Sequence, residues 1–383
     1  MIGEAVMVDG HTVSATIRAG DGPRTVRWVL PGPAGDHADD AVLVSALLPA
    51  MAAGTALTVE RPVSRRLLAG VSTIQDVFET WSRDKERTRG WEPRFRRVPV
   101  HATVRPDAAA VSGRGAAAFF TGGVDSFYTA VQRRTELTGL VFVHGFDVAL
   151  ADTALRARVA SDLHRAAAAL GLPLFEVETN VRDLSDPSVQ WLDYHGAALA
   201  AVALLLAPWF QTVYVPATMT YATLDPLGSH PLVDPLWSSD DVELVHDGCE
   251  ANRLEKLRAI ARCDAARSFL RVCPKNWGGA YNCGRCEKCL RTMVAVRLLD
   301  DPRPFVSLPP LDDAALQRIA HVDVPGNGAT WDALLRAAVA QHADPALVRA
   351  LRRARIRRRV RTAARSTRRT LRLTRAGRGG PAT

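Results

Sequence analysis

Apolar and polar positions change their pattern near residue 98. Before that point, residues 12–17 and 24–30 alternate between apolar and polar side chains, which predicts two strands joined by a turn. Residues 41–51 carry apolar side chains at helical spacing, and residues 74–83 predict a second helix. Because no catalytic motif appears in residues 1–98, we interpret them as a small α+β accessory domain.

From residue 99 onward, short apolar runs alternate with helical stretches. The apolar runs predict five strands, at residues 116–120, 140–143, 174–177, 212–215 and 269–272. Helices are expected among them, at residues 152–170, 192–206 and 253–261. Repeated strand–helix units predict an α/β fold, with a parallel sheet that has helices on both faces. In such sheets, ligands bind beyond the carboxyl ends of the strands.

Charge is distributed unevenly along the 383 residues. The formal net charge is +9, but 13 arginines lie between Arg352 and Arg378, and no acidic residue follows Asp344. The rest of the chain holds 36 basic and 40 acidic residues. The basic character therefore belongs to a C-terminal tail, residues 351–383, which we expect to be disordered. This tail suits RNA or an anionic surface, although a solvated tail without a partner explains it equally well.

Membrane insertion and secretion are not indicated. The first ten residues lack the basic and apolar regions of a signal peptide. The longest apolar run, residues 197–210, is shorter than the about 20 residues that span a bilayer. We therefore expect a cytoplasmic protein without a transmembrane segment. Its oligomeric state stays open, with a homodimer as one candidate.

A glycine pair follows the first apolar run of the α/β part. The local sequence is Thr121-Gly122-Gly123-Val124-Asp125-Ser126, and a helix is expected directly after it. Glycines allow backbone N–H groups to approach phosphate oxygens, and the helix start favours negative charge. The carboxylate of Asp125 would repel phosphate unless Mg²⁺ lay between them. A tight strand-to-helix turn without a ligand is the alternative interpretation.

These residues resemble the S-G-G-x-D-S signature of the PP-loop ATP pyrophosphatases, with Thr121 in place of the first serine. The resemblance implies a Rossmann-like, adenine nucleotide alpha hydrolase-like fold. It also implies an enzyme that adenylates a substrate oxygen and releases pyrophosphate from ATP. The residues expected to bind the nucleotide are Thr121, Gly122, Gly123, Val124, Asp125 and Ser126. By the same resemblance, Asp125 holds Mg²⁺ and Ser126 assists catalysis.

Four cysteines form a second motif, Cys273-x9-Cys283-x2-Cys286-x2-Cys289. Four thiolates at this spacing can close a tetrahedral Zn²⁺ site. An iron–sulfur cluster is the alternative, since C-x2-C-x2-C also occurs in cluster ligation. Zinc is favoured because a redox cluster would have no obvious role beside a hydrolytic type of loop.

The order of the two motifs is similar to that of the 7-cyano-7-deazaguanine synthases of queuosine biosynthesis, over residues 115–295. The resemblance implies a carbon–nitrogen ligase that carries a structural zinc and takes ammonia or an amine to displace AMP. It also places Lys256 on the phosphates, and His144 and Asp147 beside the adenosine. A solvated helix face for Lys256 and a structural histidine at the strand end are the alternatives.

The predicted organisation has five parts. They are an accessory domain at 1–98, an ATP-binding domain at 99–272, a four-cysteine metal-binding segment at 273–300, a helical segment at 301–350 and the tail at 351–383. Two other functions remain open. A tRNA-thiolating enzyme would use Cys249 or Cys263, although buried unreactive thiols are the more ordinary state. A nucleotide-binding protein without catalysis would bind ATP and release no pyrophosphate.

Overall fold

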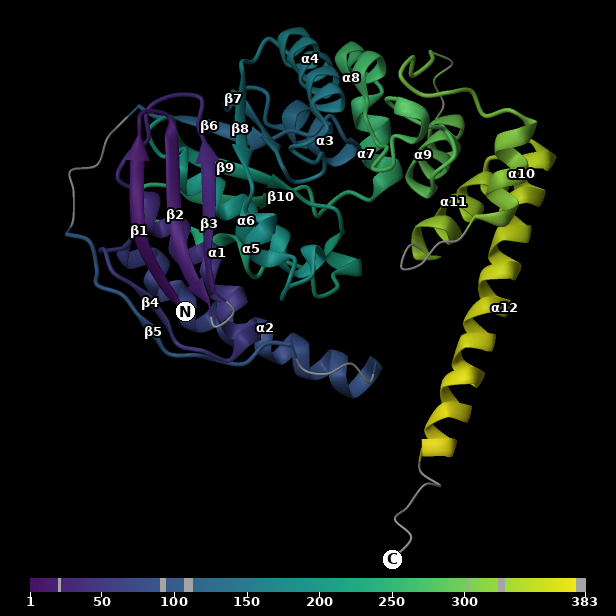
Figure 1. Ribbon diagram of the computed structural model, residues 1–383. Helices are drawn as coiled ribbons and strands as arrows, with labels where there is room; N and C mark the ends of the chain where they lie inside the picture. Colours follow the sequence, from purple (N-terminus) through teal and green to yellow (C-terminus); the bar gives the residue numbers. More distant parts are fainter. Residues whose placement is uncertain are drawn as a thin grey trace, which may run out of the picture. The chain divides into compact units, whose positions relative to one another are not determined.

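The computed structural model describes residues 1–19, 22–89, 94–106, 113–299, 301, 303–322 and 328–376. The chain forms two compact units. Unit 1 comprises Met1–Asn252 and Cys263–Phe269, and unit 2 comprises Arg253–Arg262 and the chain from Leu270 onward. Unit 1 contains a ten-stranded sheet in the order β10-β9-β6-β7-β8-β3-β2-β1-β4-β5 (Figure 1).

One half of this sheet is parallel. Its strands are β6 (Gly115–Phe119), β7 (Leu137–His144), β8 (Leu174–Thr179), β9 (Phe210–Pro216) and β10 (Glu243–Asp247). The predicted α/β fold with a mostly parallel sheet is therefore confirmed. The prediction of a fifth strand at residues 269–272 is wrong, since helix α8 (Asp264–Phe269) ends there and β10 takes that place. As an edge strand β10 exposes Glu243, so it lacks a continuous apolar run.

The N-terminal strands extend the same sheet. Strands β1 (Ile2–Asp9), β2 (Thr12–Ala19) and β3 (Gly22–Val29) form an antiparallel meander, and β3 pairs with β8. Strands β4 (Leu57–Val59) and β5 (Val100–His101) continue beyond β1. The sequence pattern predicted β2 and β3 but not β1, whose exposed Met7 and Val8 interrupt the alternation.

The helices of unit 1 are α1 (Ala38–Ala53), α2 (Arg65–Arg89), α3 (Val124–Gln132), α4 (Thr153–Ala169), α5 (Arg182–Ser185), α6 (Trp191–Leu205) and α8. Helix α1 packs against α6, and Tyr194 Oη of α6 donates a hydrogen bond of 2.8 Å to the carbonyl of Ser45. One continuous cluster of buried apolar side chains has members from Val13 in β2 to Leu244 in β10. The segment predicted as an accessory domain thus shares its core with the parallel half.

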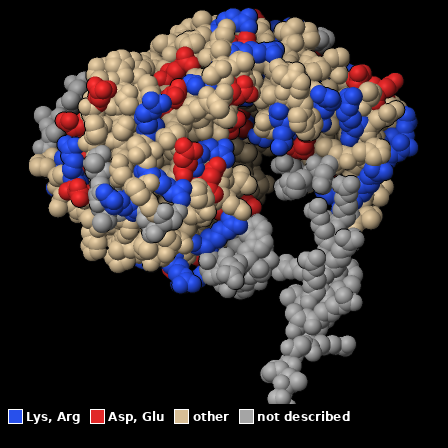
Figure 2. All heavy atoms as spheres, in the orientation of Figure 1, with Lys and Arg blue, Asp and Glu red and all other residues tan. Residues whose placement is uncertain are grey.

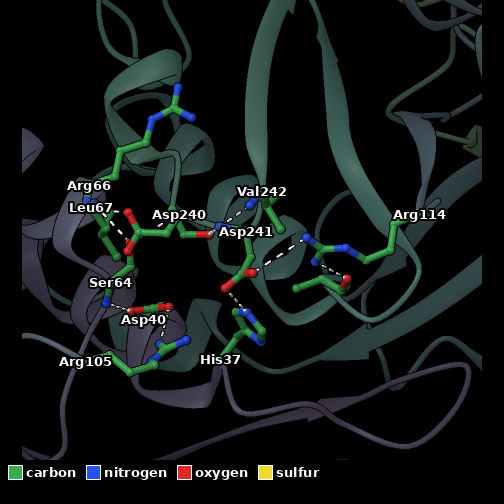
Figure 3. Close-up of polar contacts among 12 residues, drawn as sticks. His37, Asp40, Ser64, Arg66, Leu67, Arg105, Arg114, Asp240, Asp241 and Val242 are labelled. Carbon is green, nitrogen blue, oxygen red and sulfur yellow. Dashed lines mark hydrogen bonds and ion pairs between the residues drawn. The ribbon is translucent and has the colours of Figure 1, made fainter. Parts of the chain in front are cut away.

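A polar network fixes α1 and α2 to the loop before β10 (Figure 3). Asp240 accepts hydrogen bonds from Ser64 Oγ (2.9 Å), Arg65 N (2.9 Å) and Arg66 N (3.2 Å). It therefore satisfies N–H groups at the start of α2 from a distant part of the chain. Beside it, His37 Nε2 lies 2.8 Å from a carboxylate oxygen of Asp241.

Unit 2 is helical in its described residues. It contains α7 (Arg253–Ile260), α9 (Glu287–Arg297), α10 (Asp313–His321), α11 (Gly328–Ala340) and α12 (Pro345–Ala376). Buried Leu347, Ala350, Leu351 and Ala354 lie on the α12 face that packs on α10 and α11. Helix α12 continues through the arginine-rich segment, and the last seven residues of the predicted tail lie outside the described residues. No described helix is long and apolar enough to cross a membrane.

Candidate functional site

The glycine loop joins the middle strand of the parallel half to a helix. Gly122 has φ 70°, a left-handed conformation that a side chain would strain, and Gly123 precedes the first residue of α3. Ser126 Oγ is buried and donates a hydrogen bond of 3.1 Å to the carbonyl of Gly123, so it closes the loop. Asp125 is half-buried in the first turn of α3, and Thr121 is exposed.

The loop lies at the point where the strand order reverses. From β6 the chain continues to β7 and β8 on one side, whereas β9 and β10 lie on the other. The carboxyl ends of β6 and β9 therefore lie at the edge where open parallel sheets generally bind ligands. Thr218 and Tyr221, which follow β9, are exposed at this edge, and Tyr221 N bonds the carbonyl of Cys249 after β10.

A buried carboxylate at the end of β10 holds α3 in place. Asp247 accepts hydrogen bonds from Thr129 Oγ1 (2.8 Å) and Arg133 Nε (2.9 Å), and Arg133 Nη2 lies at 2.8 Å. This hydrogen-bonded carboxylate raises the pKa of Arg133. Nearby, Tyr128 Oη donates to Glu250 at 2.6 Å. Sequence reasoning missed these residues, because it predicted no strand at Glu243–Asp247.

His144 is part of a polar cluster with protein partners on both ring nitrogens. Its Nε2 lies 2.6 Å from Glu176 Oε2, and Arg156 Nε lies 3.4 Å from its Nδ1. Glu176 also bonds His164 Nε2 at 2.7 Å. The hydrogen bond from His144 and that from His164 lower the pKa of Glu176 to about 2. These contacts fit a structural histidine, and Asp147 is exposed in the loop after β7. The expected contact of His144 and Asp147 with adenosine stays a prediction.

Lys256 lies on α7, in unit 2, and its side chain is buried with 1% exposed. Its predicted contact with phosphates stays a prediction. The solvated helix face that the sequence offered as the alternative does not describe this side chain.

The four cysteines of the second motif come together in unit 2. Their sulfur atoms all lie within 4.8 Å of one another. The Sγ atoms of Cys273 and Cys286 are 3.8 Å apart, and those of Cys283 and Cys289 are 4.0 Å apart. When four sulfur atoms bind Zn²⁺ tetrahedrally with Zn–S bonds of about 2.3 Å, neighbouring sulfur atoms are about 3.8 Å apart. The predicted cluster is therefore confirmed as a site that could bind a metal such as zinc.

The backbone around the cysteines supports thiolate ligands. Asn276 N donates to Cys273 Sγ at 3.1 Å, and Cys286 N donates to Cys283 Sγ at 3.3 Å. The neighbouring Cys289 thiol lowers the pKa of Cys286 to about 5. Buried Asn282 holds the loop by bonding the carbonyls of Leu270 and Ser307 at 2.8 and 2.9 Å. These contacts arrange the loop as a ligand set for one ion.

The two other cysteines do not form a disulfide. Cys249 is buried, with 1% exposed, and Cys263 is half-buried. The burial of Cys249 gives no support to a thiol-based reaction at that residue.

Comparison of the chain with protein-family models, curated proteins and solved structures finds no match. The resemblance to PP-loop enzymes therefore depends on the two sequence motifs and stays a prediction.

Proposed function

We propose that unit 1 binds ATP at the glycine loop and transfers its AMP group to an oxygen of a substrate, with release of pyrophosphate. The observation that carries this proposal is the position of residues 121–126 at the switch point of the parallel sheet. The strand order β8-β7-β6-β9-β10 matches the 3-2-1-4-5 order of Rossmann-like sheets, and it supports a PP-loop type of fold.

The loop supplies the elements that phosphate binding needs. Left-handed Gly122 turns the chain, and the N-terminal N–H groups of α3 and its dipole favour an anion there. Mg²⁺, when bound, would neutralise phosphate charge beside Asp125. Ser126 maintains the loop through its bond to Gly123, so we assign it a positioning role. The motif resemblance assigns the counter-charge for the leaving pyrophosphate to Lys256, and this role stays a prediction of the resemblance.

The reaction would proceed by in-line displacement. A substrate oxygen attacks the α-phosphorus, the bond from that phosphorus to the bridging oxygen breaks, and pyrophosphate leaves with the electron pair. Ammonia or an amine then attacks the activated carbon, and AMP leaves. A carboxylate of the 7-carboxy-7-deazaguanine type is the first candidate substrate, by the resemblance of the motif order.

We further propose that the four cysteines hold a structural zinc ion. Sulfur atoms bound to the separate irons of a cluster would lie farther apart than the 3.8 and 4.0 Å observed here. Zinc would supply folding energy to unit 2 and no redox chemistry. Metal analysis should find one zinc per chain, and a visible absorption band of an iron–sulfur cluster would contradict the assignment.

The test is to measure nucleotide products from ATP and Mg²⁺ with a substrate panel that includes 7-carboxy-7-deazaguanine and ammonium. The wild type should produce AMP and pyrophosphate, and Asp125→Asn should lose turnover. Asp76→Asn, on α2, is the matched control because the Asp76 side chain is 56% exposed and its ion pair is with Arg97. ADP and phosphate as products would refute the proposal, as would an Asp125→Asn enzyme with full activity.

A further inference from the structure

The two units carry opposite net charges. Unit 2 contains 27 basic and 9 acidic residues, a net charge of +18, whereas unit 1 contains 22 basic and 31 acidic residues, a net charge of −9. Lys and Arg side chains gather on the surface over α10 to α12 (Figure 2). Such a charge on one folded unit favours a polyanionic partner.

The four-cysteine loop presents an aromatic ring beside cations. Trp277 is 48% exposed, unusual for so large an apolar side chain, and the Arg285 guanidinium lies 6.0 Å from its ring centroid. Lys275 of the same loop and Lys288 in the first turn of α9 are exposed. Left-handed Asn276 (φ 43°) and Gly278 (φ 70°) flank Trp277 and fix the backbone that carries it. An exposed ring among cations is the arrangement on which single-stranded bases stack.

A second basic element is joined to this loop through α9. Helix α12 has 32 residues, with 13 arginines and no acidic residue. Trp331 of α11 donates a hydrogen bond of 2.9 Å to Glu287, which begins α9 directly after Cys286. Arg358 of α12 bonds Asp332 of α11 at 2.5 Å. The metal loop and the first half of α12 therefore belong to one packed frame.

We propose that unit 2 binds single-stranded nucleic acid, with a base stacked on Trp277 and phosphates contacted by Lys275, Arg285 and the arginines of α12. A membrane surface fits less well, because a membrane-binding helix needs bulky apolar residues opposite its cations. Up to Val360, the last residue of α12 whose side chain the structure describes, the exposed large apolar residues are Ile356 and Val360, and the sequence of the whole helix contains no aromatic residue. This inference is independent of the adenylation reaction.

The experiment measures the fluorescence anisotropy of labelled 12-nucleotide RNA and DNA oligomers with the full-length, zinc-loaded protein across a salt series. Loss of base stacking costs about 1–3 kcal/mol, so Trp277→Ala should weaken binding about 5- to 150-fold, while Trp277→Phe retains it. Deletion of residues 361–383 removes seven arginines. At about 0.7 per phosphate contact, the slope of log K against log salt should fall by up to about 5.

Lys275→Glu, at an exposed site, provides a second test in case Trp277→Ala does not fold. Comparable affinity for RNA and DNA supports stacking and phosphate contacts alone, and a preference for RNA adds recognition of the 2′-hydroxyl. Unchanged affinity in both Trp277→Ala and Lys275→Glu would overturn the proposal. So would binding to vesicles that contain anionic lipid without binding to either oligomer. ATP is absent from the assay, so failure of the proposed adenylation would not affect the outcome.

Discussion

Removal of the Asp247 carboxylate should destabilise unit 1 and loosen the helix that carries the glycine loop. In Asp247→Ala, the fully buried Thr129 hydroxyl loses its acceptor, which costs about 1–3 kcal/mol. The Arg133 guanidinium is 39% exposed and regains water, so its lost ion pair adds at most about 1 kcal/mol. We therefore expect a loss of about 1–4 kcal/mol in the free energy of unfolding.

Urea unfolding, followed by tryptophan fluorescence and circular dichroism, measures this loss. Asp247→Asn keeps an acceptor for Thr129 and should lose less, about 1–2 kcal/mol. Glu243→Ala is the matched control, because Glu243 lies on the same strand with a side chain that is 55% exposed. It should unfold like the wild type.

A double-mutant cycle tests the reasoning itself. Thr129→Val removes the buried hydroxyl, so the effects of Thr129→Val and Asp247→Ala should overlap by about 1–3 kcal/mol in the double variant. Strictly additive effects would refute the assignment of the cost to this hydrogen bond. If the loop binds ATP, Asp247→Ala should also raise the KM for ATP, whereas Glu243→Ala should not.

Three further predictions concern other parts of the chain. Asp240→Ala leaves α2 without the acceptor at its N-terminus and should cost about 0.5–2 kcal/mol in urea unfolding, whereas Asp241→Ala should leave the α2 amide contacts intact. Glu176 has its pKa lowered on folding, so it stabilises the folded state above about pH 4.5 and this contribution is lost as pH falls towards 2. With about a third of the side chain exposed, that contribution is about 1–2 kcal/mol, and Glu176→Gln should flatten the curve of stability against pH. A chelator that removes the metal should lower the melting temperature of unit 2, and so should Cys289→Ser. Added zinc should restore the melting temperature of the chelated wild type but not that of Cys289→Ser. A chelator without effect would contradict a structural metal.

The features that could be predicted from the sequence are motifs whose residues lie close together along the chain. The cysteine spacing predicted the cluster because all four ligands lie within 17 residues. The glycine pair predicted a strand–turn–helix unit because the turn needs a residue with positive φ, and Gly122 supplies it with φ 70°. Both signals are carried by neighbouring residues, so no knowledge of the tertiary structure was required.

Contacts between distant segments were not predictable in this way. Asp247 was missed because β10 is a polar edge strand, and its partners Thr129 of α3 and Arg133, directly after α3, precede it by more than 100 residues. The partners of Asp240 lie about 175 residues earlier in the chain. The alternation over residues 24–30 predicted a strand, but no pattern in it specified pairing with β8. Periodicity records which face of an element is buried and not which element covers that face.

The pairing of β3 with β8 has a consequence for synthesis of the chain. Trp28 pairs with Thr179, so the hydrogen-bonding edge of β3 stays uncovered until about 150 more residues have been translated. At about 5–20 residues per second this takes roughly 8–30 s, during which an unpaired strand edge is exposed on the ribosome. Chaperone binding to the nascent N-terminal meander would shield that edge. Chains stalled before residue 174 should therefore aggregate more readily than chains released after residue 252.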